Sequence, residues 1–226
     1  MGAYNLASLL SINGLNTLLF SDPYAKLYCT SMLVTAATAT EGGQKNVIYL
    51  DLDTMFSAYL KAGLVRAQGV DVYLPSEGRL ITMLNDALAK IDEEKEKCSL
   101  VIFDSVNSFY TMYYNSYYRR SEKKRGGGAG GNINHLLSVI LMLLVRQGVS
   151  LGVPVLATSM LRFRKEGGWK QSPASRRLLQ KKSASRFEVE RAGDEIVVRV
   201  LEHDKVPAGT TLSLGLVGDY FATTLR

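Results

Sequence analysis

The sequence predicts an α/β protein, with a mostly parallel sheet, helices on both faces of that sheet, and antiparallel strands at its C-terminal end. Three observations support this architecture. The apolar runs 47–50, 100–103 and 153–157 do not alternate with polar residues, which is typical of parallel strands buried on both faces. Helical patterns separate such runs up to about residue 160. Short strand-like segments with turn signals then follow toward the end of the chain.

The individual elements follow from local spacing and from turn residues. Apolar residues repeat at helical spacing in several segments, and glycine or proline interrupts them. Residues 4–15 are predicted to form a short entry helix and a turn that ends at Gly14, and the other predicted helices cover 26–39, 56–62, 79–97, 110–118 and 133–145. The predicted strands cover 16–20, 47–50, 70–74, 100–103, 153–157, 186–189, 195–202, 212–216 and 219–224. The glycine tract 126–131 is expected to be flexible.

The composition indicates one globular domain over residues 1–226. Of these 226 residues 46% are hydrophobic and 21% are charged, which is ordinary for a globular protein. The two cysteines, Cys29 and Cys98, lack the spacing of a disulfide framework or a zinc site. The longest apolar stretch, 136–145, is too short to span a bilayer, and the N-terminus lacks a signal-peptide pattern. We therefore expect a cytoplasmic protein that does not bind membranes.

Positive charge is concentrated in two segments. The net charge is +6, but residues 119–125 alone hold five basic residues against one acid, and residues 162–186 hold nine against one. Such concentration favours a polyanionic partner over general solubility. The alternative is that both segments are simply solvated basic loops.

The segment 16–39 has the strand–turn–helix order in which a phosphate-binding loop would lie. A working loop reads G-x-x-x-x-G-K-[ST], because its glycines let backbone N–H groups wrap the phosphates and its hydroxyl holds magnesium. If Lys26 is the lysine, the glycine positions hold Phe20 and Ala25, and the hydroxyl position holds Leu27. Pro23 also removes a donor N–H. We therefore do not expect ordinary ATP binding at this position.

The order of motifs along nearly the whole chain resembles the RecA-like recombinase superfamily, and within it the archaeal RadA group and its paralogues. LNTLLFSDPYAK (15–26) occupies the Walker A region. VIYLDLDTMF (47–56) places Asp53 where that family has its water-activating Glu, and LVIFDSVNSF (100–109) resembles the Walker B strand, with Asp104 as its acid.

The later motifs resemble the same family with further losses. VPVLATSML (153–161) resembles the strand before the second DNA loop, and Met160 stands where the family has a Gln that senses the γ-phosphate. SASRFEVER and EIVVRVLEHDKVPAG (183–209) resemble the paired late strands and the cap over a neighbour's ATP. Glu202 and Asp204 match the cap positions, and its proline is absent.

This resemblance implies a RecA-like core without working nucleotide machinery. Lys26, Asp53 and Asp104 are then degenerate remnants and not catalytic residues, and neither a cofactor nor a metal is expected. Asp104 can be explained without magnesium, as a polar strand end that caps the following turn. Residual ATPase activity through an altered loop is the remaining enzymatic alternative.

The resemblance also implies two DNA-binding loops, 115–131 and 162–182, both basic and both carrying aromatic residues. Basic side chains neutralise phosphates, and rings stack on bases without reading their identity. The candidate DNA-binding residues are Tyr117, Tyr118, Arg119, Arg120, Lys123, Lys124 and Arg125 in the first loop, and Arg162, Phe163, Arg164, Lys165, Trp169, Lys170, Arg176, Arg177, Lys181 and Lys182 in the second.

Three alternatives remain for these segments. The tyrosines at 110, 113, 114, 117 and 118 share one face of a helix, so they can simply pack on neighbouring structure. The loops can bind an acidic partner protein. Phe163 and Trp169 can anchor a protein–protein interface.

The first functional hypothesis is a non-catalytic RadA-like paralogue that binds single-stranded DNA and assists homologous recombination and DNA repair within a protein complex. The resemblance suggests RadA, another paralogue or a SWIM-domain protein as partner. The chain begins close to its first core strand, without the recombinases' N-terminal domain and polymerisation segment, so we do not expect long filaments of this chain alone. The second hypothesis is a KaiC-like pseudo-ATPase, a regulatory or scaffold subunit that binds protein and not DNA.

Overall fold

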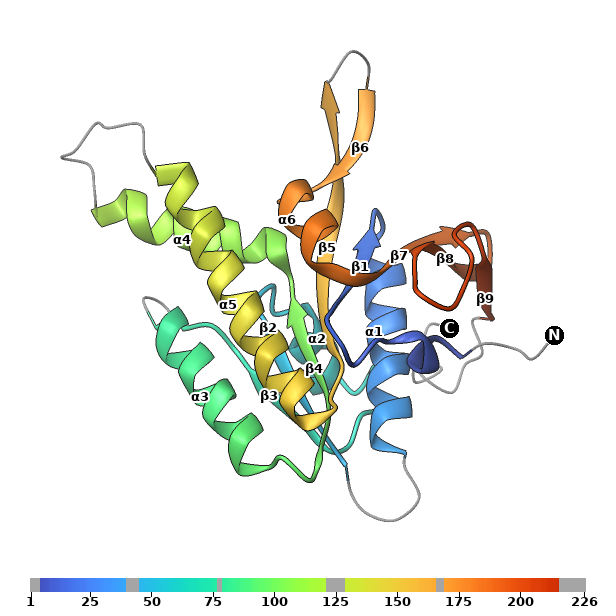
Figure 1. Cartoon of the computed structure of the whole chain (residues 1–226), viewed down its shortest axis with the longest axis horizontal. Helices are drawn as coiled ribbons and strands as arrows, with labels where there is room; N and C mark the ends of the chain where they lie inside the picture. The colour runs from blue at the N-terminus through green and yellow to red at the C-terminus, as the bar shows by residue number, and fades with distance from the viewer. Residues whose placement is uncertain (1–4, 40–44, 77–78, 121–128, 166–168, 216–226) are drawn as a thin grey trace.

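A computed structural model of the chain describes residues 5–39, 45–76, 79–120, 129–165 and 169–215. Its central feature is a sheet whose strands run through most of the molecule (Figure 1). The described strands are β1 (Leu15–Phe20), β2 (Asn46–Asp51), β3 (Val70–Tyr73), β4 (Cys98–Asp104), β5 (Val155–Lys165), β6 (Trp169–Pro173), β7 (Ser183–Ala192), β8 (Glu195–Glu202) and β9 (Thr211–Gly215).

The sheet has the order β3-β2-β4-β5-β1-β7-β8-β9, with β6 paired to β5 beside this path. The pairs from β3 through β1 to β7 are parallel. The pairs β7–β8 and β8–β9 are antiparallel. The predicted parallel sheet with a C-terminal antiparallel extension is confirmed, and the predicted strand 219–224 lies outside the described residues.

Helices cover both faces of the sheet. The described helices are the 3₁₀ turn η1 (Leu6–Leu9), α1 (Pro23–Thr38), α2 (Met55–Lys61), α3 (Leu80–Glu93), α4 (Val106–Arg120), α5 (Ala129–Leu151) and α6 (Arg176–Lys182). The core on one face joins η1, α1 and α2, and the core on the other joins α3, α4, α5 and α6. Strand β4 serves both, since Leu100 and Ile102 point into the first core and Val101 and Phe103 into the second.

Several boundaries differ from the prediction. The short entry helix expected within 4–15 is the four-residue 3₁₀ turn η1, which the Asn5 side chain caps. Helix α5 begins at Ala129, inside the glycine tract expected to be flexible, and runs to Leu151. Its length follows from its burial, because Leu137, Leu141 and Leu144 all pack into the core and override the poor helix propensity of glycine.

The prediction of a second loop over 162–182 was wrong. Strand β5 continues to Lys165, β6 returns antiparallel to it over Trp169–Pro173, and α6 follows directly. The two strands form an arm that projects beyond the body of the molecule (Figure 1). Charged and polar residues dominate this segment, so the sequence carried only two signals of regular structure. Apolar and polar residues alternate over 161–164, and Leu179 is the buried anchor of α6.

By length and composition, one segment of the described chain, Ile133–Leu151 in α5, is long and apolar enough to cross a membrane. One side of this helix lies in the core of the protein, while Val139, Leu143 and Val149 are exposed. This partial burial of α5 is ordinary for a core helix of a globular protein.

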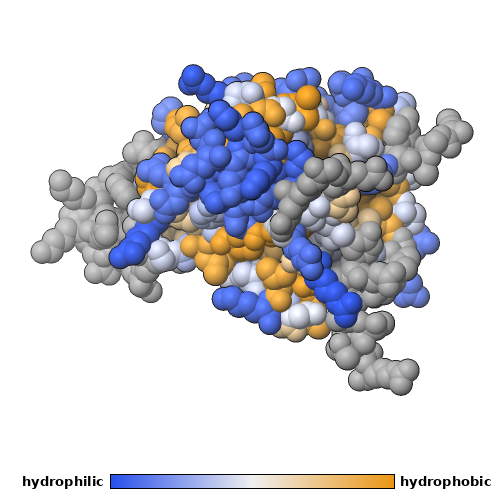
Figure 2. Space-filling model, turned by 90° about the horizontal axis from the view of Figure 1, so that it is seen from below, coloured by the Kyte–Doolittle hydropathy of each residue, from blue (hydrophilic) through white to orange (hydrophobic). Residues whose placement is uncertain are grey.

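Seen from below, at the end of the molecule opposite the projecting arm, the surface carries a broad hydrophilic area with smaller hydrophobic areas around it (Figure 2).

Candidate functional site

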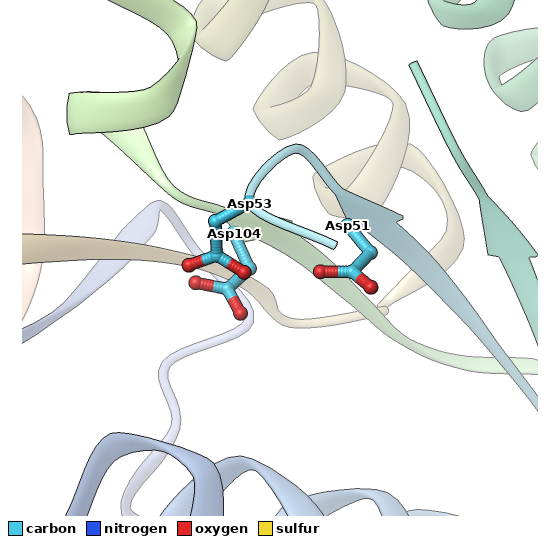
Figure 3. Close-up of side chains that lie close together, drawn as sticks. All are labelled: Asp51, Asp53 and Asp104. Atoms are coloured by element: carbon cyan, nitrogen blue, oxygen red, sulfur yellow. The ribbon is translucent and has the colours of Figure 1, made fainter. Parts of the chain in front are cut away.

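The carboxyl ends of β2 and β4 bring acidic side chains to one edge of the sheet. Asp51 and Asp104 are register partners at the ends of these neighbouring parallel strands, and Asp53 follows two residues after β2. One carboxylate oxygen from each of the three residues lies within 4.8 Å of the corresponding oxygens of the other two, and Figure 3 shows the three side chains close together. This is the edge at which α/β proteins commonly place their ligands.

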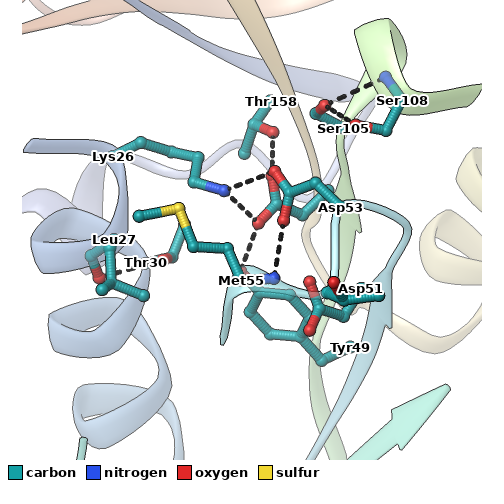
Figure 4. A network of polar contacts seen from close by, with 12 residues as sticks. Lys26, Leu27, Thr30, Tyr49, Asp51, Asp53, Met55, Ser105, Ser108 and Thr158 are labelled. Atoms are coloured by element: carbon teal, nitrogen blue, oxygen red, sulfur yellow. Dashed lines mark hydrogen bonds and ion pairs between the residues drawn. The ribbon is translucent and has the colours of Figure 1, made fainter. Parts of the chain in front are cut away.

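Lys26 of α1 reaches into this acidic cluster. Its Nζ lies 2.8 Å from Oδ2 of Asp53 and 2.8 Å from Oδ2 of Asp104, and the Lys26 side chain is fully buried (Figure 4). Burial alone would lower the pKa of Lys26, but the two carboxylates outweigh it and raise the pKa above its ordinary value of 10.5. Lys26 is therefore charged at neutral pH and balances both aspartates.

Asp104 is held by further hydrogen bonds from two strands. The hydroxyl of Tyr49 on β2 donates to Oδ2 of Asp104 at 2.7 Å, and the hydroxyl of Thr158 on β5 donates to Oδ1. Burial first, and then the charge of Asp104, raise the pKa of Tyr49 well above its ordinary value, so the phenol stays a donor. The interpretation of Asp104 as a cap of the following turn was wrong, because the hydroxyl of Ser105 accepts the N–H of Ser108 there.

Of the three acids, Asp51 has the least hydrogen bonding and counter-charge to offset its burial. Its Oδ2 accepts the backbone N–H of Ser57 at 2.7 Å, while its buried Oδ1 has no hydrogen-bond partner among the described residues. Burial, and more weakly the neighbouring charges of Asp104 and Asp53, raise the pKa of Asp51 to about 6. Asp51 therefore titrates in a range in which an exposed aspartate is already fully ionised.

The connection between β1 and α1 does not form a phosphate-binding loop. Only Ser21 and Asp22 separate the strand from the helix, whereas a working loop has four residues between its two glycines. The Asp22 side chain accepts the N–H of Tyr24 at 2.9 Å, and Pro23 occupies the first helical position. The N-terminus of α1, where phosphates would bind, is thus capped by a carboxylate of the chain itself.

A divalent cation would need the carboxylate oxygens of this cluster as ligands. The ammonium group of Lys26 already contacts Oδ2 of both Asp53 and Asp104, and its positive charge opposes a metal ion beside it. We assign neither a metal nor a nucleotide phosphate to these residues.

The sequence named Lys26, Asp53 and Asp104 as separate remnants, and the structure joins them in one ion-pair network. Sequence reasoning missed Tyr49 and Thr158, which complete the network. The only signal for them was their position, because Tyr49 lies near the carboxyl end of β2 and Thr158 comes directly after the part of β5 that pairs with β4.

The second basic segment forms a two-sided arm. Residues opposite one another in an antiparallel pair share a face, and successive residues point to opposite faces. One face carries Phe163, Lys165, Trp169 and Gln171, and the other carries Arg162, Lys170 and Ser172. The two rings are diagonal neighbours and are 64% and 71% exposed, which is far from the burial of core aromatics. The side chain of Arg164 lies outside the described residues.

Helix α6 continues the basic surface. Its side chains Arg176, Arg177, Lys181 and Lys182 are exposed around the buried Leu179. Arg162 of the arm and both arginines of α6 line one concave region of the surface. The structure thus brings most of the second set of candidate residues together.

The first basic segment is described only in part. Its described backbone ends α4 at Arg120, and Lys123, Lys124 and Arg125 lie outside the described residues. The side chains of Tyr117, Tyr118, Arg119 and Arg120 also lie outside them. Tyr110 and Tyr113, nearer the start of the helix, pack against the core, as the alternative interpretation of the tyrosine face expected.

Comparison with solved structures finds the same architecture in a recombinase. The chain superimposes on a structure described as "Crystal structure of the RadB recombinase" with a TM-score of 0.64, covering 97% of this chain and 96% of that one at 15% sequence identity. No protein-family model and no curated protein matches the sequence.

The protein therefore has the fold of the RecA-like recombinases, as the order of its motifs predicted. A fold hosts many activities, so the function of this chain is argued from its site.

Replacing Lys26 with methionine should destabilise the protein strongly. The Lys26→Met side chain keeps the volume but leaves Asp53 and Asp104 without their counter-charge, which should lower the free energy of unfolding by about 3–5 kcal/mol. Urea unfolding at pH 7 measures this loss. The exposed Lys61→Met is the control, and adding Asp53→Asn and Asp104→Asn to Lys26→Met should recover part of the loss. A Lys26→Met protein as stable as the wild type would contradict the ion-pair network.

Asp51 should make the protein less stable as the pH rises from about 4 to about 6. The pKa of Asp51 is near 6 in the folded protein against an ordinary 3.8, so over this range the unfolded chain loses its proton while the folded chain keeps it. The free energy of unfolding should fall by about 2–3 kcal/mol through this group, with the full loss present above that range.

The Asp51→Asn variant isolates this effect, because an amide oxygen can still accept the N–H of Ser57. Urea unfolding at pH values from 4 to 7 should show a smaller decline for the variant than for the wild type. If the free energy of unfolding declines equally with pH in the variant and the wild type, the pKa of Asp51 is not raised in the folded protein.

Proposed function

We propose that this protein is a non-hydrolysing RecA-like paralogue, related to RadA, that binds single-stranded DNA and assists homologous recombination and DNA repair. The observation that carries the DNA-binding part is the surface formed by the β5–β6 arm and α6. Seven described cations of this surface are all exposed: Arg162, Lys165, Lys170, Arg176, Arg177, Lys181 and Lys182.

The chemistry of this surface suits a single strand. Lysine and arginine neutralise phosphates and give an affinity that falls with salt and does not depend on sequence. Exposed rings such as Phe163 and Trp169 stack on bases, which are accessible in a single strand and are already stacked on each other in a duplex. The described residues between Arg162 and Lys182 include no carboxylate to oppose a polyanion.

The non-hydrolysing part rests on the network around Lys26. For Lys26 to contact a phosphate it would have to leave two ion pairs, of which the one with Asp104 is fully buried, and the freed Asp53 and Asp104 would then face the phosphate with like charge. The short β1–α1 connection supplies no wrapping backbone to offset this cost. We propose that the ion pair has taken over the structural role that bound nucleotide has in an active ATPase.

A protein without its own ATP cycle has no nucleotide-driven control, so we propose that it acts inside a cytoplasmic complex. RadA, another paralogue or a SWIM-domain protein is the proposed partner, as the resemblance of the sequence suggests.

One observation favours the second function, a KaiC-like scaffold subunit. Phe163 and Trp169 lie together on the face of the arm opposite to Arg162 and Lys170. Adjacent exposed aromatic residues are typical anchors of protein interfaces. In this alternative the arm binds a partner protein through its rings, and DNA is not involved.

Fluorescence titration with single-stranded DNA tests the first function. The emission of Trp169, the only tryptophan, should be quenched, and the affinity should fall steeply between low and raised salt. Arg162→Ala and Lys170→Ala should each weaken binding on all sequences alike and reduce the salt slope by about 0.7. Lys61→Ala, an exposed lysine on α2 at the other face of the sheet, is the matched control and should change neither quantity.

For Trp169→Ala the readout is the anisotropy of labelled DNA, and the expected loss is about 1–3 kcal/mol. Absence of salt-dependent binding in the wild type would favour the scaffold function instead.

ATP should be neither bound nor hydrolysed. We expect no phosphate release above the buffer background in the presence of Mg²⁺, and no rise in melting temperature with millimolar ATP, because a ligand stabilises only the state that binds it. ATP hydrolysis that disappears in Asp104→Asn would overturn this part of the proposal and revive the residual ATPase.

A further inference from the structure

A cavity of about 1020 Å³ lies beside the basic face of the arm, lined by residues of α4, α5, β5, β6 and α6. Its walls are tied together by polar contacts among three elements. Tyr110 of α4 contacts both Asn134 of α5 and Ser175, the residue before α6, through its hydroxyl. The Ser175 hydroxyl donates to Oδ1 of Asn134 at 3.0 Å. The shape of the cavity is therefore fixed by hydrogen bonds that do not involve a ligand.

The lining has the chemistry of an anion site with a polar interior. Arg162 and Arg177 contribute guanidinium groups from two different elements, and the exposed His135 adds a ring nitrogen. Among the described residues that line the cavity there is no carboxylate. Gln180 contributes an exposed amide, a group that can both donate to and accept from a base edge. Cavities of about 300–1,000 Å³ accommodate small organic ligands, so a nucleotide with its hydration fits this volume.

Successive side chains of the arm point to opposite faces, and this determines where the base of a bound nucleotide can lie. Arg162 and Ser172 share one face of the hairpin and both line the cavity, whereas Phe163 and Trp169 point to the opposite face. A nucleotide whose phosphate is held by Arg162 therefore cannot stack its base on these rings. The cavity is the polar space next to that phosphate position.

We propose that the cavity takes up one nucleotide of a bound DNA strand, with its phosphate on Arg162 and Arg177 and its base inside, within reach of His135 and Gln180. This inference rests on the proposed single-strand binding and adds to it a site for an individual nucleotide. The arm contacts the nucleotides before and after this one in the strand. The cavity holds the one nucleotide whose base is not stacked on its neighbours.

Calorimetric titration of the full chain with the free mononucleotides dTMP and dAMP tests this inference. Both should bind, inorganic phosphate should bind more weakly, and the nucleoside thymidine should not bind measurably. The combined variant His135→Ala/Gln180→Ala should lower the affinity for mononucleotides by about tenfold. Arg177→Lys keeps the charge but loses the planar fork, so it should lower the same affinity several-fold. Gln171→Ala, the same residue type outside the cavity, is the matched control.

The outcomes separate this inference from the proposed function. If the strand binds and mononucleotides do not, or if His135→Ala/Gln180→Ala leaves mononucleotide affinity unchanged, the inference is overturned and strand binding stands. Inorganic phosphate that binds as tightly as dTMP would also overturn it, since the cavity would then be a site for anions alone. If mononucleotides bind as expected but no strand does, the proposed strand binding fails, and with it the assignment of the cavity to a nucleotide of a strand. Lys170→Ala should weaken strand binding only.

Discussion

The buried ammonium group of Lys26 determines the architecture of this molecule at the carboxyl edge of its sheet. Asp104 can stay fully buried there, with the partly exposed Asp53 beside it, because Lys26 contacts both carboxylates at 2.8 Å. The contact in turn requires α1 to begin immediately after β1, with Ser21 and Asp22 as the whole connection. A longer glycine-rich loop would move the start of the helix and open the space that Lys26 now fills. The ion pairs of Lys26 therefore depend on the short connection between β1 and α1.

The network also closes an edge of the sheet at which other α/β proteins bind their ligands. In an open site, acids at the strand ends would face water or a metal-bound phosphate. Here Tyr49 and Thr158 donate to Asp104, and Lys26 links α1 to β4, so the edge is closed by the side chains of the protein itself. Asp51 has one oxygen without a hydrogen-bond partner among the described residues, and its pKa is raised. It is therefore the acid of this edge whose burial is least offset by hydrogen bonds and opposite charge.

Sequence reasoning predicted the fold well because apolar runs ending in polar residues identify buried parallel strands directly. It named Lys26, Asp53 and Asp104 but not their mutual contact. The phosphate-loop pattern assigns each residue a contact with a nucleotide, and it says nothing about contacts between the residues themselves. The pairing depends on how α1 meets β2 and β4, which only the packed structure defines. The sequence predicted a loop for the arm because charged and polar residues dominate 161–165 and 169–173, and the pairing of these two segments is defined only in the folded structure.

The two faces of the β5–β6 arm have a consequence for assembly. Arg162 and Lys170 lie back to back with Phe163 and Trp169 across a single layer of two strands. A strand that places phosphates on the first pair and stacks neighbouring bases on the rings must therefore pass around the edge of the hairpin. A protein bound to the aromatic face would compete with the stacking of bases but not with the phosphate contacts on the other face.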